Sequence, residues 1–321
     1  MRRYIGVDLG GTNTVAGLVD EKGKLYVKKS VSTPRDGDPE RIVDTIYDVV
    51  TALLSGEGLQ PEDIQAIGIG SPGVVDIQNG VVLFANHLHF RNTPLAELCR
   101  RRFNRPVHLV NDANAAAYGE YIAGGGRGAS SLVAITLGTG IGGGIIIDGK
   151  ILTGYAFAGA ELGHMVIDMD GRACSCGKRG CFETYASATG LIHSTQAYMR
   201  NHPETLMWKL CNNSLGNVSG RTAFDAKRAG DAGGESVIES YIHTLAIGLG
   251  NIINSLEPEI LLIGGGISHE GEYLLGPLRE EVHKQLFSFS QQKTRIVSAT
   301  LGNDAGIIGA ALADEAVDSE N

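Results

Sequence analysis

Two short turns rich in glycine and threonine carry the groups best suited to hold phosphate. The first runs from Asp8 to Thr12 and the second from Leu137 to Gly140. Glycine lets backbone N–H groups approach an anion, and threonine hydroxyls add further donors. Either turn alone could equally be a tight turn without a ligand. Because the same feature occurs twice, we expect a pair of phosphate-binding loops.

A second set of residues has the composition of a metal site. Cys174, Cys176 and Cys181 lie within eight residues of one another, and His164 precedes them by ten. Three thiolates and one imidazole are typical ligands of closed tetrahedral zinc sites, and the glycines of this loop permit sharp turns. The C-x-C-x4-C spacing differs from that of a zinc finger. The pattern alone therefore leaves open both a metal site and a group of reduced free thiols.

Asp112 is the carboxylate best placed for acid–base chemistry. It follows a short apolar run at 107–110 and precedes a helical pattern at 113–123, so we expect it at the end of a strand. A carboxylate in this position can accept the proton of a hydroxyl group during phosphoryl transfer. The competing interpretation is that Asp112 only caps the helix that begins at Ala113.

The elements that must position these residues follow a duplicated plan. Residues 5–20 and 133–148 each contain an apolar run, a Leu-Gly turn, a second apolar run and a closing Asp. A Gly-Lys turn follows each copy, two residues later in the first than in the second. Two glycine-turn hairpins that start 128 residues apart predict two lobes built alike.

Around these hairpins, helical and strand patterns alternate, which predicts α/β lobes with mixed sheets. The expected strands cover 64–70, 107–110 and 259–263, and the expected helices cover 40–54, 94–103, 113–123, 184–200, 236–256, 270–286 and 305–316. Two G-x-G-x-x-G matches continue into extended apolar chain, which excludes a dinucleotide-binding fold, and no P-loop motif occurs. Residues 201–235 lack a clear period and stay unassigned.

The composition limits the class of protein. The chain has 321 residues, of which 43% are hydrophobic, and its 45 glycines point to several tight loops near a ligand. A net charge of −9 without a basic stripe argues against a nucleic-acid partner. Neither a signal peptide nor a membrane-spanning run is expected, which favours the cytoplasm. Five cysteines, an odd number, argue against a disulfide framework.

Together, the motifs resemble those of the actin, heat-shock chaperone and hexokinase superfamily, and within it those of the ROK family (repressors, open reading frames and sugar kinases). The resemblance spans residues 4–312, about the whole chain, and is carried by the segments 8–12, 111–114, 138–140, 161–164, 174–183 and 264–266. It implies a two-lobed, actin/hexokinase-like (ribonuclease H-like) α/β fold with duplicated domains, mixed sheets and a central cleft. We expect residues 1–112 and 304–321 to form the small N-terminal lobe, and 113–303 the large C-terminal lobe with the zinc loop.

The resemblance also assigns roles to residues. Asp112 would be the catalytic base, and a structural Zn²⁺ would be bound by His164, Cys174, Cys176 and Cys181. ATP and Mg²⁺ would be bound by Asp8, Gly10, Gly11, Thr12, Gly138, Thr139, Gly140, Gly265 and Gly266. The sugar would be bound by Gly73, Asn86, Asn111, Asp112, Glu161, His164 and Glu183. For the two glutamates, a solvated surface charge is the competing interpretation, and Glu183 could also begin a helix.

The activity implied is transfer of the γ-phosphoryl group of ATP to the 6-hydroxyl of a hexose, with glucose favoured. Kinases for N-acetylglucosamine, N-acetylmannosamine or fructose are alternatives, as is a sugar-sensing regulator without catalysis. A ROK repressor would need an N-terminal helix-turn-helix, for which we expect no room before Asp8. The chain departs from the family pattern at Phe90, where Trp is usual, and at Ala160, where Gly is frequent. Family members are commonly dimers or tetramers, so we expect a homo-oligomer.

Overall fold

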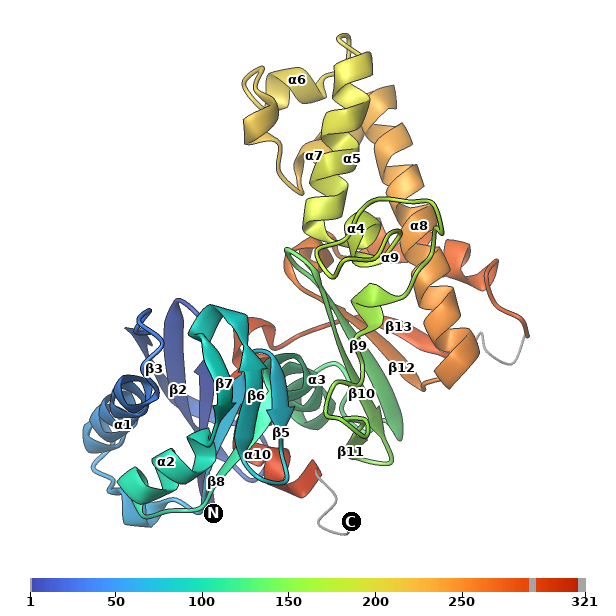
Figure 1. Ribbon diagram of the computed structural model, residues 1–321. Helices are drawn as coiled ribbons and strands as arrows, with labels where there is room; N and C mark the ends of the chain where they lie inside the picture. The colour runs from blue at the N-terminus through green and yellow to red at the C-terminus, as the bar shows by residue number, and fades with distance from the viewer. Residues whose placement is uncertain (1, 289–292, 317–321) are drawn as a thin grey trace. The chain divides into compact units, whose positions relative to one another are not determined.

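The structure is a computed structural model that describes residues 2–288 and 293–316. Its elements are shown in chain order in Figure 1. The chain divides into two compact units. Unit 1 comprises residues 1–133, 144–160 and 299–321, and unit 2 comprises residues 134–143 and 161–298. The lobe boundaries expected from the sequence stay a prediction.

Unit 1 is built on a mixed five-stranded sheet of order β3-β2-β1-β4-β8. Strands β1 (Arg3–Leu9), β2 (Asn13–Asp20) and β3 (Leu25–Ser32) are joined in sequence and pair antiparallel. Strands β4 (Ile67–Ser71) and β8 (Val107–Asn111) run parallel to β1. The predicted hairpin and the predicted mixed sheet are both present.

The helices of unit 1 are α1 (Pro39–Gly56), α2 (Leu95–Phe103), α3 (Asp112–Ala123) and α10 (Ala305–Leu312). Helix α1 begins where the Asp38 side chain accepts the N–H of Glu40, and it buries a stripe of residues spaced three or four apart. That stripe packs into the core of the unit. The helix expected at 305–316 ends at Leu312 and continues as a 3-10 turn, Ala313–Ala316.

Helix α10 approaches both the sheet and α3 unusually closely because glycines line both contacts. A Cβ atom on Gly6 of β1 or Gly68 of β4 would overlap a carbonyl oxygen of α10. The same holds between α3 and α10, where a Cβ on Gly119 or Gly309 would overlap the backbone of the other helix. The interpretation of glycine as a sign of ligand loops is therefore wrong for these four positions, where glycine serves close packing.

A second, three-stranded sheet of order β5-β6-β7 was not predicted. Its strands are short: β5 (Val74–Asp76), β6 (Val81–Ala85) and β7 (Phe90–Thr93). Such brief runs, separated by glycine and asparagine turns, do not establish a period of two over enough residues to be recognised. A 3-10 turn, η2 (Asn86–Leu88), lies between β6 and β7.

The other five-stranded sheet repeats the first, with the order β11-β10-β9-β12-β13. Its hairpin strands are β9 (Ser131–Leu137), β10 (Ile141–Ile147) and β11 (Lys150–Ile151). Strands β12 (Ile260–Gly264) and β13 (Arg295–Ser298) pair in parallel. The division between the two units passes through β9 and β10. Because both sheets place the hairpin first and the later strands on one side, the duplication predicted from the sequence is confirmed.

The helices of unit 2 are α4 (Glu183–Ala186), α5 (Ala188–Asn201), α6 (Met207–Leu210), α7 (Thr222–Arg228), α8 (Ala232–Leu256) and α9 (Glu272–His283). Helix α8 packs against α5, α7 and α9 (Figure 1). The single helix expected at 184–200 is two helices, because the Ser187 side chain caps a new helix by accepting the N–H of Gly190. The unassigned region 201–235 holds α6, α7, short turns and the first residues of α8.

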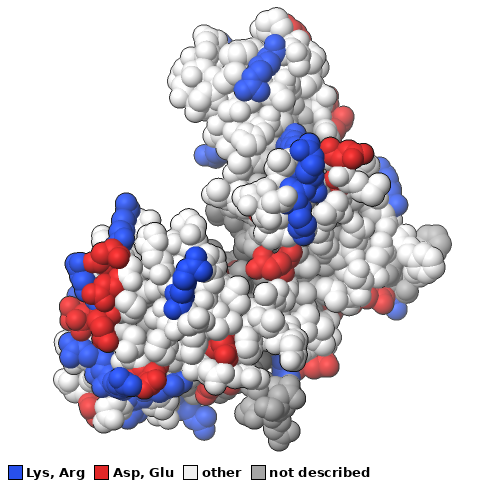
Figure 2. Space-filling view, viewed as in Figure 1, with Lys and Arg blue, Asp and Glu red and all other residues white. Residues whose placement is uncertain are grey.

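Within the described part of the chain, no helix combines the length and apolar character needed to cross a bilayer. On the face drawn in Figure 2, both acidic and basic side chains lie over the region of α1 and α2. Arg101 pairs with Glu97 there, and Arg102 lies 3.2 Å from Asp44.

Candidate active site and metal centre

The carboxyl ends of three parallel strands bring Asp8 and Asp112 together in unit 1. Asp8 lies opposite Gly70 in the β1–β4 ladder, and Ser71 lies opposite Asn111 in the β4–β8 ladder. Asp112 follows directly as the first residue of α3. Parallel strands present their carboxyl ends at one edge, which is where α/β proteins commonly place ligand-binding side chains. The strand-end position predicted for Asp112 is confirmed.

The two carboxylates influence each other electrostatically. Asp8 is half-buried, and its pKa is raised to about 6, first by burial and then by the negative charge of Asp112. The raised pKa means that the folded protein disfavours the charged form of the Asp8 carboxylate. A bound cation would relieve this penalty, and oxygen donors of this kind suit Mg²⁺.

We expect Asp8→Asn to stabilise the metal-free protein at alkaline pH. The penalty for ionised Asp8 develops as pH rises from about 4, its ordinary value, to about 6, and stays constant above. Without Mg²⁺, urea denaturation should give a free energy of unfolding about 1–3 kcal/mol higher for Asp8→Asn than for wild type at pH 8. Near pH 4 the two proteins should be equal.

Asp48→Asn, which removes an exposed aspartate of α1, controls for the loss of a surface charge. An equal gain in both variants, or a gain that is independent of pH, would contradict the burial of Asp8 charge as the cause.

Asn111, not Asp112, caps helix α3. The Asn111 Oδ1 atom accepts the N–H of Asn114 at 3.1 Å, while its Nδ2 donates to the carbonyl of Gly73 at 2.9 Å. The Asp112 Oδ1 atom accepts the N–H of the next residue at 2.8 Å. The competing interpretation of Asp112 as the N-cap is therefore wrong, and both side-chain ends of Asn111 already have protein partners.

The turn after β1 is closed by its own backbone and braced by a residue that the sequence did not single out. Gly10 donates its N–H to the carbonyl of Asn13 at 2.9 Å. Thr33 Oγ1 donates to the carbonyl of Gly10 at 2.7 Å and lies 2.8 Å from the hydroxyl of Thr14. No sequence pattern marks Thr33, and its role follows from the structure, where its buried hydroxyl needs a hydrogen-bond partner. Among the described residues, no hydrogen bond is made by the N–H of Gly11, which leaves that donor for a ligand.

Two residues that the sequence analysis predicted for the sugar, and one that it missed, also lie in unit 1. Gly73 has a φ of +89°, and a side chain there would overlap the Phe84 carbonyl, so only glycine fits this turn. Asn86 is exposed at the start of η2. Gly306, which the sequence analysis missed, faces Asp8, because a Cβ at position 306 would lie 3.6 Å from the Asp8 carboxyl carbon.

The second glycine–threonine turn, in unit 2, is also closed by its own backbone, through a hydrogen bond to the residue two positions on. Gly138 donates its N–H to the carbonyl of Gly140 at 3.1 Å, and its own carbonyl accepts the N–H of Ala188 at the start of α5. Gly265, at a φ of +83°, packs on this strand end, since a Cβ there would lie 2.5 Å from the Leu137 carbonyl oxygen. Gly266 has no neighbour that crowds its Cβ position and begins the 3-10 turn η5 (Gly266–Glu270).

A cavity of about 460 Å³ adjoins this turn within unit 2. Thr139, Gly140 and Glu183 line one part of it, and Arg172, Ser187 and His193 line another. The Arg172 guanidinium is held by the carbonyl of Thr184 at 2.9 Å and by the Ser194 hydroxyl. Ligand pockets in proteins are commonly of this size.

The three cysteines and His164 form one cluster. Their ligand atoms all lie within 4.8 Å of one another. The sulfurs of Cys176 and Cys181 are 3.6 Å apart, and the Cys174 sulfur lies 3.6 Å from His164 Nδ1. A tetrahedron with Zn–S bonds of about 2.3 Å places its sulfurs about 3.8 Å apart. The donor set therefore has the composition and spacing of a tetrahedral zinc site.

Without a cation, two of the three thiols resist ionisation. Burial, followed by hydrogen bonds with the other two cysteines, raises the pKa of Cys181 to about 12. Burial also raises the pKa of Cys174, whereas the backbone N–H of Lys178 lowers that of the exposed Cys176. Metal binding requires thiolates, so a divalent cation would supply the charge that this crowded group lacks.

Glu183 links the cysteine cluster to the turn at 138–140. One of its carboxylate oxygens accepts from the Cys174 thiol at 3.2 Å and lies 3.7 Å from His164 Nδ1. The other accepts the N–H of Ile141 at 3.4 Å. Glu183 also begins α4, as the competing interpretation proposed. Glu161 is exposed and precedes the 3-10 turn η3 (Leu162–His164), with its carbonyl accepting the N–H of His164.

Ala160, just before Glu161, has a left-handed backbone with a φ of +62°. An L-residue other than glycine in this region is strained by roughly 1–2 kcal/mol. The glycine frequent at this position in the resembling family is therefore the residue that the backbone favours, and alanine here stores local strain.

Comparison with known proteins finds relatives that match nearly the whole chain. The sequence model of the ROK family matches residues 4–315. A glucokinase of Thermotoga maritima is 40% identical over 96% of each chain. The crystal structure of a ROK family glucokinase from Streptomyces griseus in complex with glucose and AMPPNP is 38% identical, with a TM-score of 0.78 over 98% of this chain and 99% of that one. A xylose repressor of Caldicellulosiruptor bescii is 29% identical over 95% of this chain and 76% of its own length.

Proposed function

Because this chain belongs to the ROK family, we propose that it is an ATP-dependent glucokinase. It transfers the γ-phosphoryl group of ATP to the 6-hydroxyl of glucose. The observation that carries the proposal is the pair of carboxylates, Asp8 and Asp112, at the carboxyl ends of parallel strands beside a glycine–threonine turn. Relatives named glucokinases, at 40% and 37% identity, support the same activity.

Asp112 acts as the general base in this proposal. Its carboxylate accepts the proton of the sugar hydroxyl as that oxygen bonds to the γ-phosphorus and the bond from the γ-phosphorus to the bridging oxygen of ADP breaks. ADP leaves with the electron pair of that bond. The fixed start of α3, capped by Asn111, holds the Asp112 backbone in place for this transfer.

Asp8 would hold the Mg²⁺ that accompanies ATP, and Gly10, Gly11 and Thr12 would contact the ATP phosphates. Mg²⁺ would neutralise charge that develops on the transferring phosphoryl group. In unit 2 we assign Gly138, Thr139 and Gly140 to the phosphates, and Gly265 and Gly266 to adenosine. The free N–H of Gly11 and the uncrowded position of Gly266 support these assignments.

A structural Zn²⁺ would be bound by the cluster of His164, Cys174, Cys176 and Cys181, whose ligand atoms lie within 4.8 Å of one another. The ion would brace the loop of residues 161–183 from which Glu161, His164 and Glu183 bind sugar hydroxyls. His164 can serve both roles because an imidazole has two ring nitrogens, one for the metal and one for a hydrogen bond. In unit 1 we assign Gly73, Asn86, Asn111 and Asp112 to the sugar as well.

We expect glucose to be phosphorylated with a kcat/KM at least tenfold above those of N-acetylglucosamine, N-acetylmannosamine and fructose. A site built to pair hydroxyl groups leaves polar groups unpaired when one hydroxyl is replaced, which costs about 10²-fold or more. A coupled assay of ADP release across these sugars measures the preference, and phosphorus NMR of the product identifies the 6-position.

If an N-acetyl sugar has a higher kcat/KM than glucose, the glucose assignment is wrong and the kinase assignment stands. If no sugar produces ADP release above the rate without sugar, the kinase assignment fails too. A sugar-responsive repressor would then be the second candidate, favoured by the 29% identity to a xylose repressor.

Two further proposals concern the setting of the enzyme. We propose a cytoplasmic location, in keeping with the ATP-dependent sugar kinase activity proposed above. We also propose a homo-oligomer, either a dimer or a tetramer, without a nucleic-acid partner. Size-exclusion chromatography with light scattering would determine the oligomeric state.

A further inference from the structure

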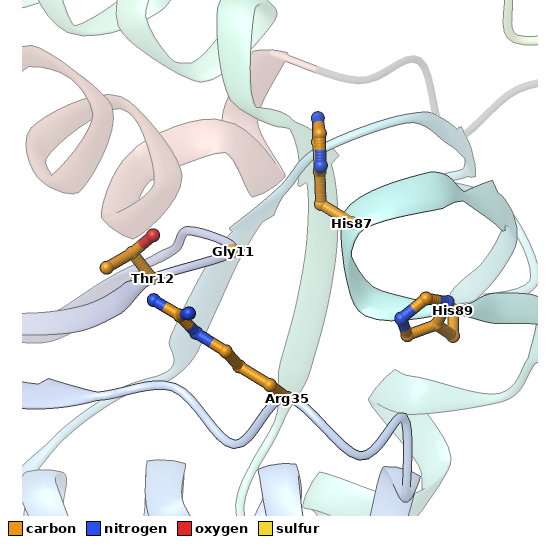
Figure 3. A pocket seen from close by; sticks show the side chains of 5 residues that line it. All are labelled: Gly11, Thr12, Arg35, His87 and His89. Carbon is orange, nitrogen blue, oxygen red and sulfur yellow. The ribbon is translucent and has the colours of Figure 1, made fainter.

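A cavity of about 600 Å³ lies beside the first glycine–threonine turn, entirely within unit 1. Gly11 and Thr12 line it on one side, and Arg35, His87 and His89 line the rest. Figure 3 shows the Arg35 guanidinium next to Thr12, with the ring of His89 directed toward the same space from the opposite side. The lining therefore consists of donors and potential cations, without a carboxylate.

The charge of Arg35 is available to a ligand. Among the described residues, no hydrogen bond or ion pair to its guanidinium is present, and the side chain is exposed. The acidic residues next to it are engaged elsewhere: Asp36 pairs with Arg41, and Asp38 caps α1 by accepting the N–H of Glu40. A planar guanidinium with free donors is the side chain best matched to a phosphate group.

The two histidines, one within η2 and one directly after it, pack against glycines. His87 packs so closely on Gly11 that a Cβ there would lie 3.0 Å from the His87 Cβ. His89 has a left-handed φ of 55° and donates its N–H to the carbonyl of Asn86 at 3.1 Å. It packs in the same way on Gly37. Histidine donates from one ring nitrogen when neutral and from both when protonated, so each ring can pair with an anion.

We propose that Arg35 and His89 bind a phosphate group in this cavity, next to but separate from the ATP phosphates that Gly11 and Thr12 contact. The cavity, at about 600 Å³, is many times larger than the roughly 30 Å³ that one water molecule occupies in the liquid. It therefore has room for more than a single phosphate group. A phosphorylated hexose or a short chain of linked phosphates therefore fits the space as well as the charge. The site goes beyond the proposed kinase reaction, and its ligand needs no turnover to bind.

Titration calorimetry with inorganic phosphate tests the site while a non-hydrolysable ATP analogue and Mg²⁺ fill the donor site. We expect one phosphate to bind per chain. Arg35→Gln should weaken this binding at least about tenfold, because it removes a charge-assisted hydrogen bond. His89→Asn should also weaken it, and asparagine tolerates the left-handed backbone at this position. Affinity for the ATP analogue should be unchanged in both variants.

Arg101→Gln is the matched control, because it removes an exposed arginine of unit 1 that does not line the cavity. The proposal is overturned if no phosphate binds while the analogue is present, or if Arg35→Gln and Arg101→Gln bind it equally. If the analogue itself fails to bind, the proposed kinase function is in error. Titrations of wild type and Arg35→Gln without analogue then still decide whether the cavity takes phosphate.

Competition identifies the source of the phosphate. Glucose 6-phosphate and tripolyphosphate are each titrated against bound inorganic phosphate in wild type and Arg35→Gln. Displacement at lower concentration by the sugar phosphate, dependent on Arg35, would assign the cavity to reaction product. Tighter displacement by tripolyphosphate would assign it to a phosphate chain. Displacement that is insensitive to Arg35→Gln would place both ligands elsewhere and overturn the proposal.

Discussion

Asp112→Asn is expected to lower kcat by about 10²–10⁴-fold while leaving the affinities for glucose and ATP nearly unchanged. Asparagine keeps the shape of the side chain and can still accept the N–H of the next residue, but it cannot take a proton from the sugar hydroxyl. The helix start survives because Asn111, not Asp112, caps α3. The loss should therefore appear in the chemical step alone.

Steady-state kinetics and calorimetric binding of both substrates measure this separation of kcat from affinity. Asp48→Asn, with the same change of charge on an exposed face of α1, should retain wild-type kcat. An Asp112→Asn protein with more than about a tenth of wild-type kcat would lie outside the range for a lost general base. That result would remove Asp112 from the role of base.

Cys176→Ser is expected to abolish both zinc binding and activity, although no cysteine is assigned to the substrate. Cys176 is exposed, so the exchange of sulfur for oxygen costs little packing, and its effect must come from the lost ligand. Binding to structural zinc sites is worth about 10–16 kcal/mol in small zinc domains, and that energy contributes to folding. Without the ion, the loop that carries Glu161, His164 and Glu183 would lose its brace.

Elemental analysis of freshly purified protein should find one zinc per wild-type chain and little in Cys176→Ser. Cys211→Ser is the matched control, because Cys211 lies in the same unit outside the cluster and its Sγ donates to a carbonyl that a hydroxyl can also reach. It should keep both zinc and activity. Zinc-free wild type, or a fully active Cys176→Ser, would disprove the structural zinc.

The features predicted best were those that depend on short patterns of neighbouring residues in the sequence. The two glycine–threonine turns follow short apolar runs, and their repetition predicted two lobes built alike, with which the matching strand orders agree. The actin/hexokinase-like fold and the ROK family, both inferred from motifs, are confirmed by the match over residues 4–315 and by the solved glucokinase structure. The cysteine spacing predicted a cluster because the four ligands lie on one short segment, residues 164–181.

Features that depend on distant parts of the chain were missed. The brace from Thr33 to Gly10 joins residues 23 apart, and no local period marks it. Ser187 divides a helix that the apolar pattern had joined, because its hydroxyl caps the second part. The contacts of Glu183 with both Cys174 and Ile141 depend on how the loop returns to the second turn, which spacing does not encode.

The close packing of α10 on glycines of the first sheet also has a consequence for synthesis of the protein. This helix packs on β1 and β4 through Gly6 and Gly68, yet it begins at residue 305. At about 5–20 residues per second, a ribosome makes α10 roughly 15–60 s after β1. During that interval the apolar face of the first sheet that α10 covers is exposed to solvent. Nascent chains should therefore be sensitive to protease and should bind chaperones until the last few dozen residues emerge.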